Sequence, residues 1–333
     1  MHLLGGDVLS GPQILSIFLL SCQVLVSAQT SADCTQRDVI VNVRDGHGNF
    51  IEGLPHSAFQ AVFRDGIPRV QSAEIKNEPG RIIVLLDASG SIADSQRAWH
   101  TARLIAGDLM AHSRQDSGIA LVVFAEKVER TIDFSSRPED ILAWLHDVQD
   151  GKHLVPKHEK GTALLDTIMY AIRLFGQTSP GDAIYAITDG NDNRSKSSED
   201  EVENALLNAN IRFFAFYATD DLPIPSVERA LDLRFLRNLF INTGGAGLAA
   251  GGRSTSIDGL SASAKEQLSA QLQYVYDLMS RYYALRIELP VKLRKKRSWE
   301  LRVVDADGRP RKDLYLSYPR AFPPCASTVG TNQ

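Results

Sequence analysis

With 333 residues, the chain exceeds one typical domain and is long enough to bury a sizeable core. Its 44% hydrophobic and 23% charged residues are typical of a globular protein. The formal net charge of −4 at pH 7 argues against general nucleic-acid binding, which requires a basic surface.

The amino-terminal segment predicts export. Residues 14–26 are apolar and are followed by Val26-Ser27-Ala28, a small-residue cleavage pattern. We therefore predict a signal peptide over residues 1–28, although no Lys or Arg precedes its apolar part. A membrane anchor is the alternative, but these 13 residues are too few to cross the roughly 30 Å bilayer core as a helix. Lipidation of Cys22 is a minor alternative, and after cleavage we expect no integral membrane span.

A small β unit is expected next, over residues 33–80. Hydrophobic residues alternate there with a period of two, beginning with valines at positions 39, 41 and 43. The two strands with this pattern each end in an Asp-Gly pair, which is typical of hairpin turns. We therefore predict antiparallel strands.

The apolar run Ile82 to Leu86 ends abruptly in Asp87-Ala-Ser89-Gly-Ser91. Because the run does not alternate, it is typical of a strand covered on both faces in a parallel sheet. In an extended segment, residues two and four positions apart project the same way, so Asp87, Ser89 and Ser91 are expected to converge. Three hard oxygens at one point indicate a hard cation such as Mg²⁺.

From Arg81 to about Gly245, predicted strands and helices alternate, which indicates an α/β fold with a doubly wound, Rossmann-like, mostly parallel sheet. We assign residues 81–255 to this domain. Ligands of such sheets bind at the carboxyl ends of the strands, where Asp87 and Asp189 both fall. After the first strand we expect a helix at 95–112, a hairpin of 119–124 with 128–134, helices at 138–148 and 163–175, a strand from 183, a helix at 199–208, a strand at 211–218 and a helix at 227–241.

The glycine-rich segment 245–254 partly matches two nucleotide-binding fingerprints. Both fingerprints need a strand before and a helix directly after, but here a helix precedes, and Arg253 replaces the essential lysine of a phosphate loop. We therefore predict a mobile Gly/Ala loop without a nucleotide.

The carboxyl-terminal part is expected to contain a linking helix within residues 256–281 and strands within residues 282–325. Residues 299–304 are predicted to pair with the strand at 283–289 through a hairpin. We interpret the basic run between them, 292–297, as a solvated hairpin tip, with docking to an anionic surface as the less favoured alternative. Neither terminal unit has enough strands to bury a core alone, so we expect the two units to form one β-sandwich.

The pattern D-x-S-x-S after an apolar strand resembles the metal-ion-dependent adhesion site of von Willebrand factor type A domains. That pattern also needs a Thr opening a later helix and an Asp ending a later strand, and Thr162 and Asp189 are the counterparts. The resemblance implies that Ser89, Ser91 and Thr162 ligate the metal directly, whereas Asp87 and Asp189 act largely through water. The leader, with its two Asp-Gly turns, is similar to that of the exported acidobacterial von Willebrand A-related family.

The resemblance implies an exported ligand-binding module, located in the periplasm, in the cell envelope or outside the cell. Mg²⁺, or alternatively Mn²⁺ or Ca²⁺, would capture an Asp or Glu carboxylate of a protein partner. A non-catalytic accessory subunit of an enzyme or ATPase assembly is one alternative, which the signal segment disfavours. A structural scaffold of the cell envelope is another, which the complete five-residue set disfavours. No nucleophile with a positioned base is visible, so we expect no enzyme.

The cysteines predict a disulfide. Cleavage after Ala28 leaves Cys34 and Cys325, and an exported chain enters an oxidising compartment. Cys34 precedes the first expected strand and Cys325 follows the last one. If these strands share one sandwich, the two Cα atoms can approach to the usual separation of about 4.4 to 6.8 Å. The alternative is two free thiols on disordered tails.

Overall fold

The computed structural model describes residues 34–64, 66–112, 118–149, 151–155, 160–218, 234–249 and 261–325. The predicted signal peptide at 1–28, with Cys22, lies outside these residues, as does the first part of the helix expected at 227–241. Within the described ranges, no helix has the length and hydropathy needed to cross a membrane.

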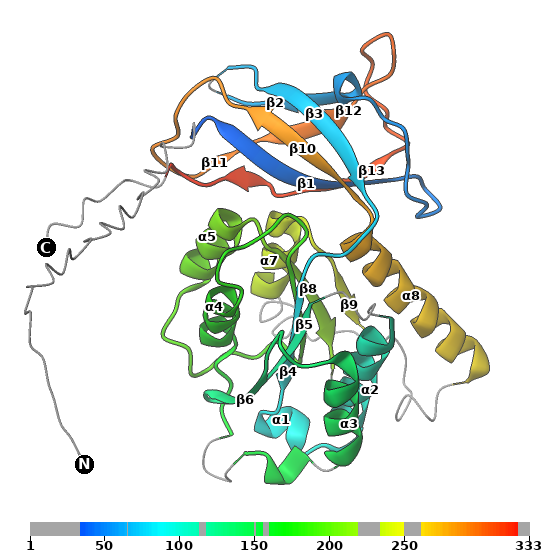
Figure 1. Ribbon diagram of the computed structural model, residues 1–333, viewed down its shortest axis with the longest axis vertical. Helices are drawn as coiled ribbons and strands as arrows, with labels where there is room; N and C mark the ends of the chain where they lie inside the picture. Colours follow the sequence, from blue (N-terminus) through cyan, green and yellow to red (C-terminus); the bar gives the residue numbers. More distant parts are fainter. Residues whose placement is uncertain are drawn as a thin grey trace, which may run out of the picture. The chain divides into compact units, whose positions relative to one another are not determined.

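One part of the molecule is a six-stranded sheet with the strand order β6-β5-β4-β7-β8-β9 (Figure 1). All neighbours are parallel except β6, which pairs antiparallel with β5. The predicted doubly wound sheet is therefore confirmed. The strands are β4 (Ile82–Asp87), β5 (Ile119–Phe124), β6 (Val128–Ile132), β7 (Ala183–Thr188), β8 (Arg212–Tyr217) and β9 (Gly247–Ala249).

Helices cover both faces of this sheet, which explains why β4, β5 and β7 consist of buried residues throughout. One apolar core lies between the sheet and helices α2, α3 and α8, and a second lies between the sheet and α4, α5 and α7 (Figure 1). The helices are α1 (Gly90–Ala93), α2 (Gln96–His112), α3 (Pro138–Asp147), α4 (Leu164–Leu174), α5 (Glu199–Ala209), α7 (Arg234–Thr243) and α8 (Ala262–Ser280), with single 3-10 turns at His56–Ala58 and Gly151–His153.

The second part is built from both ends of the chain, as predicted. Its largest sheet has the order β13-β1-β10-β3, and two short pairs, β12-β2 and β11-β14, accompany it. Apolar residues from both ends share one buried core, including Val41 of β1 and Leu285 of β10. The strands are β1 (Gln36–Arg44), β2 (Phe59–Val62), β3 (Arg69–Lys76), β10 (Tyr282–Glu288), β11 (Arg297–Ser298), β12 (Glu300–Val303), β13 (Tyr315–Ser317) and β14 (Ala321–Phe322).

Two strand-pairing predictions are wrong. The strand expected at 299–304 does not pair with β10: β12 pairs with β2, while β10 lies between β1 and β3. The basic run 292–297 is therefore no hairpin tip but a connection between sheets, and Lys296 Nζ lies 2.8 Å from Glu203 Oε1 of α5. The amino-terminal strands likewise pair with carboxyl-terminal strands and not with one another.

The prediction of a mobile loop at 245–254 is also wrong at its start, because Gly247–Ala249 forms β9 beside β8. The glycines here are required by close packing. A Cβ on Gly245 would clash with the carbonyl oxygen of Phe213, and a Cβ on Gly247 would clash with the ring of Phe240. Residues 250–254 lie outside the described part of the chain.

Helix α8 ends on a buried arginine. Arg212 of β8 is 2% exposed, and its two terminal nitrogens donate to the carbonyl oxygens of Leu278 and Met279, at 2.6 and 2.8 Å. These carbonyls belong to the last turn of the helix, where no intrahelical donor remains. Burial lowers the pKa of Arg212 to about 10. Asn42 Nδ2 of β1 also donates to the Leu278 carbonyl, so both parts of the molecule hold this helix end.

The predicted disulfide between Cys34 and Cys325 is present, with a Cα–Cα distance of 5.8 Å. Just beside it, the backbone N–H of Leu289 donates to the carbonyl oxygen of Thr35, which brings the start of β1 against the end of β10. Cys34 therefore lies beside the end of β10, and the N–H of Cys325 donates to the carbonyl oxygen of Leu293, four residues after Leu289.

Candidate metal centre

Asp87 ends the buried strand β4 at the point where the strand order reverses. From β4 the chain continues to β5 on one side, and β7 joins on the other, so the carboxyl ends of β4 and β7 form the switch point of the sheet. Asp87 is fully buried. Its Oδ1 accepts the backbone N–H of Ser89 at 2.8 Å, and its Oδ2 accepts the hydroxyl of Thr188 at 2.6 Å.

The surroundings of Asp87 disfavour its ionised form when no positive charge compensates it. Burial raises the pKa of Asp87 to about 7, and the negative charge of Asp189 adds to the rise, against the lowering effect of the bonds from Ser89 and Thr188. Among the described residues, neither carboxylate forms an ion pair with a basic side chain. Two basic residues on the neighbouring loops already have partners: Lys160 contacts Asp94, and Arg194 Nε lies 3.1 Å from Glu126 Oε1.

Ser89 and Ser91 lie next to Asp87, but not for the reason expected from the sequence. The chain does not stay extended through Ser91, because Ser89 is the N-cap of the short helix α1 and Ser91 lies in its first turn. The helical turn places Ser89 Oγ 3.2 Å from Ser91 Oγ. Ser89 is buried and Ser91 is exposed, so this group of oxygens reaches the surface.

Thr162 belongs to a loop that two neighbouring loops hold in place. The carbonyl oxygen of Lys160 accepts the N–H of Gly90 at 3.0 Å, and the N–H of Ala163 donates to the carbonyl of Ala125 at 2.7 Å. These bonds tie the start of α4 to the loops after β4 and β5. Thr162 itself is 2% exposed.

The loop after β7 holds Thr162 from the other side. Asn193 Oδ1 accepts the N–H of Thr162 at 3.0 Å, and the backbone N–H groups of Asn193 and Arg194 both donate to the carbonyl oxygen of Thr162 at 3.0 Å. In the same loop, Asp189 accepts two bonds from Asn191, at 3.0 Å from its backbone N–H and 2.9 Å from its side-chain nitrogen. The segments that carry the five predicted residues are therefore hydrogen-bonded to one another at the carboxyl ends of β4 and β7.

Sequence reasoning missed the residues that support this arrangement. Thr188 stands directly before Asp189, and a hydroxyl at the end of an apolar strand was the available signal. Asn193 belongs to no metal-site motif visible in the sequence, and its side-chain oxygen accepts the N–H of Thr162. Asp192 similarly accepts the N–H of Leu165 at 2.8 Å, in the first turn of α4.

The donor set fits a hard divalent cation. It consists of two carboxylates and three hydroxyls, which are the ligand types that Mg²⁺, Ca²⁺ and Mn²⁺ prefer. A cation would also supply the positive charge that Asp87 and Asp189 lack in the described structure. The set contains only two acidic residues, and no group of three or more His, Cys, Asp or Glu side chains suited to a metal occurs in the described part of the chain.

Comparison with known proteins assigns the class of this domain. Residues 82–191 match the model of the von Willebrand factor type A domain. The matched segment begins at the first residue of β4 and ends two residues after Asp189. No curated protein matches the chain.

Several solved structures are similar to the chain. An aerotolerance-related membrane protein from Bacteroides fragilis is 17% identical, with 60% of this chain and 98% of that chain covered and a TM-score of 0.43. The conserved hypothetical protein BatB from Bacteroides thetaiotaomicron is 18% identical, with the same coverage and a TM-score of 0.42. A von Willebrand factor type A structure from Catenulispora acidiphila is 11% identical, with 86% and 74% covered and a TM-score of 0.41.

Proposed function

We propose that this protein is an exported module that binds an acidic group of a protein partner through a divalent cation, in the first place Mg²⁺. The observation that carries the proposal is the buried Asp87 beside Asp189, without a basic partner among the described residues and with hydroxyls of Ser89 and Ser91 next to it. A buried pair of like charges costs free energy unless a cation compensates it.

In this proposal the chain's own residues have distinct roles. Ser89, Ser91 and Thr162 offer neutral hydroxyl oxygens, and Asp87 and Asp189 offer negative charge. Thr188 and the Ser89 N–H hold both oxygens of Asp87 in fixed directions. Asn191 does the same for Asp189. When bound, Mg²⁺ would supply a site for an incoming carboxylate oxygen, because neutral hydroxyl ligands leave much of its charge unquenched.

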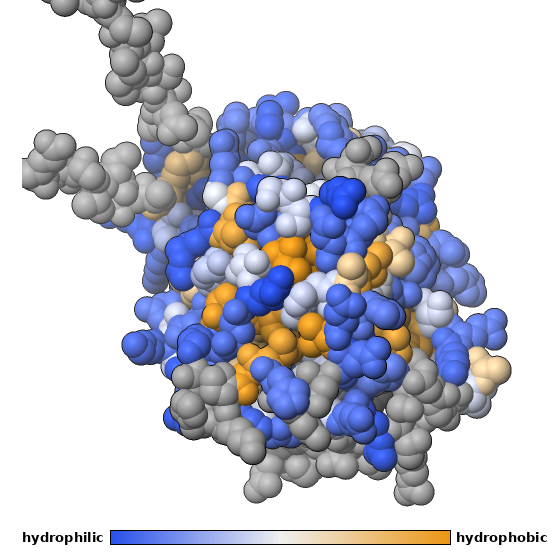
Figure 2. Space-filling model, turned by 60° about the horizontal axis from the view of Figure 1, so that its bottom comes forward, coloured by the Kyte–Doolittle hydropathy of each residue, from blue (hydrophilic) through white to orange (hydrophobic). Residues whose placement is uncertain are grey.

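The surface around the site supports a protein as the partner. Figure 2 brings the end of the molecule near α1 forward, and hydrophobic residues gather at the centre of this face within a rim of hydrophilic residues. Apolar surface of this kind, framed by polar residues, is typical of protein-interaction sites. We therefore propose that the ligand is an Asp or Glu carboxylate of a protein and not a free small acid.

Export is the proposed cellular context. The disulfide supports it, because such bonds persist in oxidising compartments and are rare in the reducing cytosol. An accessory subunit of a cytoplasmic assembly would not meet such conditions.

We further propose that the chain catalyses no reaction itself. The hydroxyls of Ser89 and Ser91 contact each other, and in the described structure neither bonds to a His or Lys that could act as its base. The carboxylate beside Ser89, that of Asp87, is fully buried and already accepts the Ser89 N–H and the Thr188 hydroxyl. Metal-dependent turnover by the purified protein that disappears in Ser89→Ala would refute this part of the proposal.

A pull-down from envelope extract tests the binding function. The wild-type chain with Mg²⁺ should retain a partner that is released by EDTA and is not captured by an Asp189→Ala bait. Asp307→Ala, which removes an exposed carboxylate in the turn after β12, outside both the candidate site and its loops, is the matched control and should behave as wild type. Partners captured equally with EDTA or by Asp189→Ala would favour a structural scaffold instead.

A further inference from the structure

Strand β1 has one edge that is only partly paired. It pairs with β10 over Gln36–Val41 on one side and with β13 over Asn42–Arg44 on the other. In an antiparallel sheet, the N–H and C=O of a residue point to the same neighbour, and the direction alternates along the strand. Because Thr35 C=O faces β10, where it accepts from Leu289, the backbone groups of Gln36 and Asp38 face the opposite edge. Within the described residues, no strand pairs with that edge before Asn42.

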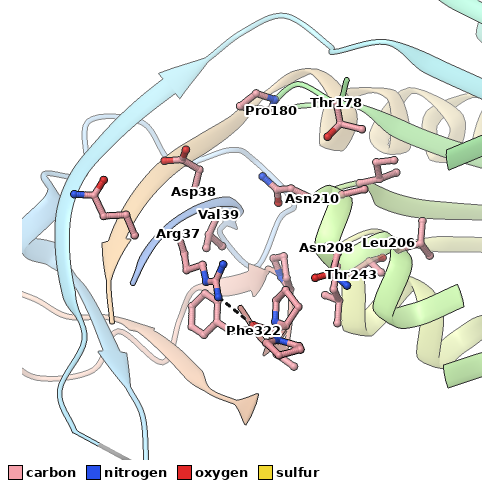
Figure 3. A pocket seen from close by; sticks show the side chains of 18 of the residues that line it. Arg37, Asp38, Val39, Thr178, Pro180, Leu206, Asn208, Asn210, Thr243 and Phe322 are labelled. Carbon is pink, nitrogen blue, oxygen red and sulfur yellow. Dashed lines mark hydrogen bonds between the residues drawn. The ribbon is translucent and has the colours of Figure 1, made fainter. Parts of the chain in front are cut away.

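This free edge borders a groove of about 640 Å³, a volume within the range of ligand sites, about 300 to 1,000 Å³. Arg37 and Asp38 line one side of it, and Asn208 and Asn210 at the end of α5 line the other (Figure 3). Gln36 also belongs to its lining. Phe322 to Cys325 line it as well. The groove is distinct from the metal centre, because none of the five predicted ligands lines it.

Arg37 gives the groove an uncompensated positive charge. Its Nη2 donates to the carbonyl oxygen of Pro323 at 3.1 Å and lies 3.9 Å from Cys325 Sγ, and its Nε is buried without a hydrogen-bond partner. No carboxylate pairs with this guanidinium in the described part of the chain. The other charged residue lining the groove, Asp38, already has a partner, since its Oδ1 lies 3.0 Å from Arg286 Nε.

These features select a ligand chemistry. A guanidinium without an ionic partner binds a carboxylate with high specificity, because its planar set of N–H donors matches the two acceptor oxygens. Free N–H and C=O groups on a strand edge select an extended backbone, which can continue the sheet.

We propose that this groove binds an extended acidic segment of a partner protein, which adds a strand to the free edge of β1. The backbone of the segment pairs with Gln36 and Asp38. One Asp or Glu side chain, on the same face of the enlarged sheet as Arg37, pairs with the guanidinium. This binding needs no metal, so it stands independently of the function proposed for the Asp87 site.

A synthetic peptide of alternating Thr and Val with one central Glu tests the charge requirement, with the Gln peptide as its matched control. Fluorescence anisotropy with the full chain, in EDTA, should show the Glu peptide binding about tenfold more tightly than the Gln peptide, as expected for one charge-assisted hydrogen bond. Arg37→Gln should abolish this difference, whereas Arg37→Lys should retain part of it. Equal binding of the two peptides to wild type, or no binding of either, would overturn the proposal.

A second arm tests strand addition. Asp38→Pro removes the N–H that faces the groove but leaves the pairing of Arg37 and Val39 with β10, so it should abolish peptide binding. Asp38→Ala loses the same carboxylate as the proline variant but keeps that N–H, so it should still bind the Glu peptide more tightly than the Gln peptide. A proline variant can lose structure, so the wild-type chain is also tested with a modified Glu peptide. In this peptide the amides that would pair with the backbone of β1 are N-methylated, and it should not bind.

Hydrogen exchange locates the peptide. The Glu peptide should slow exchange of the Asp38 amide at least tenfold while leaving residues 87–91 unchanged. Binding that is lost in EDTA, that survives N-methylation, or that protects residues 87–91 instead would overturn the proposal.

Discussion

Thr188 donates its hydroxyl to Asp87 Oδ2 at 2.6 Å, and the two residues end neighbouring parallel strands. The same Thr188 oxygen accepts the N–H of Gly190 at 3.1 Å. One hydroxyl therefore couples the direction of the Asp87 carboxylate to the loop that carries Asp189.

Thr188→Val tests this coupling, because valine keeps the shape of the side chain and removes the hydroxyl. We expect a loss of about 1 to 3 kcal/mol in the free energy of unfolding, since two buried partners lose their bond. We also expect about tenfold weaker Mg²⁺ binding, because Asp87 is no longer held in one direction. Denaturant unfolding and calorimetry measure the two effects. Thr188→Ser keeps the hydroxyl and should restore both, and a serine variant as impaired as the valine variant would contradict the coupling.

Asp87→Ala should abolish Mg²⁺ binding without unfolding the sheet, because it removes charge at a strand end and leaves the apolar part of β4 intact. Thr162→Ala removes a neutral hydroxyl, so its effect should be smaller, about tenfold in affinity. Isothermal calorimetry with circular dichroism as a check of folding distinguishes the two. Unchanged Mg²⁺ affinity in Asp87→Ala would exclude the site.

Asp87 also predicts how the stability of the metal-free protein changes with pH. Its pKa of about 7 in the folded state lies above the ordinary value of 3.8, so between these values the folded protein holds a proton that the unfolded chain releases. Its contribution therefore lowers stability as the pH rises from about 4 to 7, by on the order of a few kcal/mol, and stability stays low above pH 7.

Thermal unfolding in EDTA across this pH range measures the effect as the difference between wild type and Asp87→Asn, which lacks the titrating group. Mg²⁺ at pH 8 should raise the melting temperature of the wild type and not of the variant. Parallel pH curves for the two proteins would show that Asp87 does not titrate in this range.

The disulfide should contribute about 2 to 4 kcal/mol to the free energy of unfolding. Cys34→Ser, Cys325→Ser and the double variant should lose the same amount, because each removes the one bond. Non-reducing mass spectrometry of the purified protein should find no alkylatable thiol at either position. Two alkylatable thiols without reductant would refute the bond.

The parts of the fold that could be predicted from the sequence were those in which the hydrophobic pattern within one segment determines its structure. Ile82 to Leu86 had to be a strand covered on both faces, because it is apolar without alternation. The pairing of β12 with β2 could not be predicted, because alternation shows that a segment is a strand but does not name its partner. Gly247 looked like a loop residue because the ring of Phe240, which excludes a side chain there, lies close only in the folded structure.

The candidate site shows the same limit. Asp87, Ser89 and Ser91 were visible as a motif, but a motif gives positions and not backbone path, so the helical turn at Ser91 was missed. Asn193 was missed as a support because its role is a bond to the Thr162 backbone, 31 residues away in sequence, and no side-chain pattern encodes such a bond.

The bond between Cys34 and Cys325 has a mechanical consequence. Residues 34 and 325 are 291 positions apart, yet they are joined covalently, so tension applied to the chain before Cys34 and after Cys325 runs through two sulfur atoms. The folded residues between them carry none of that load. Under pulling forces at an envelope or a cell surface, the metal centre would thus stay unstretched until the bond is reduced, and only then would β1, the strand that follows Cys34, be drawn out of its sheet.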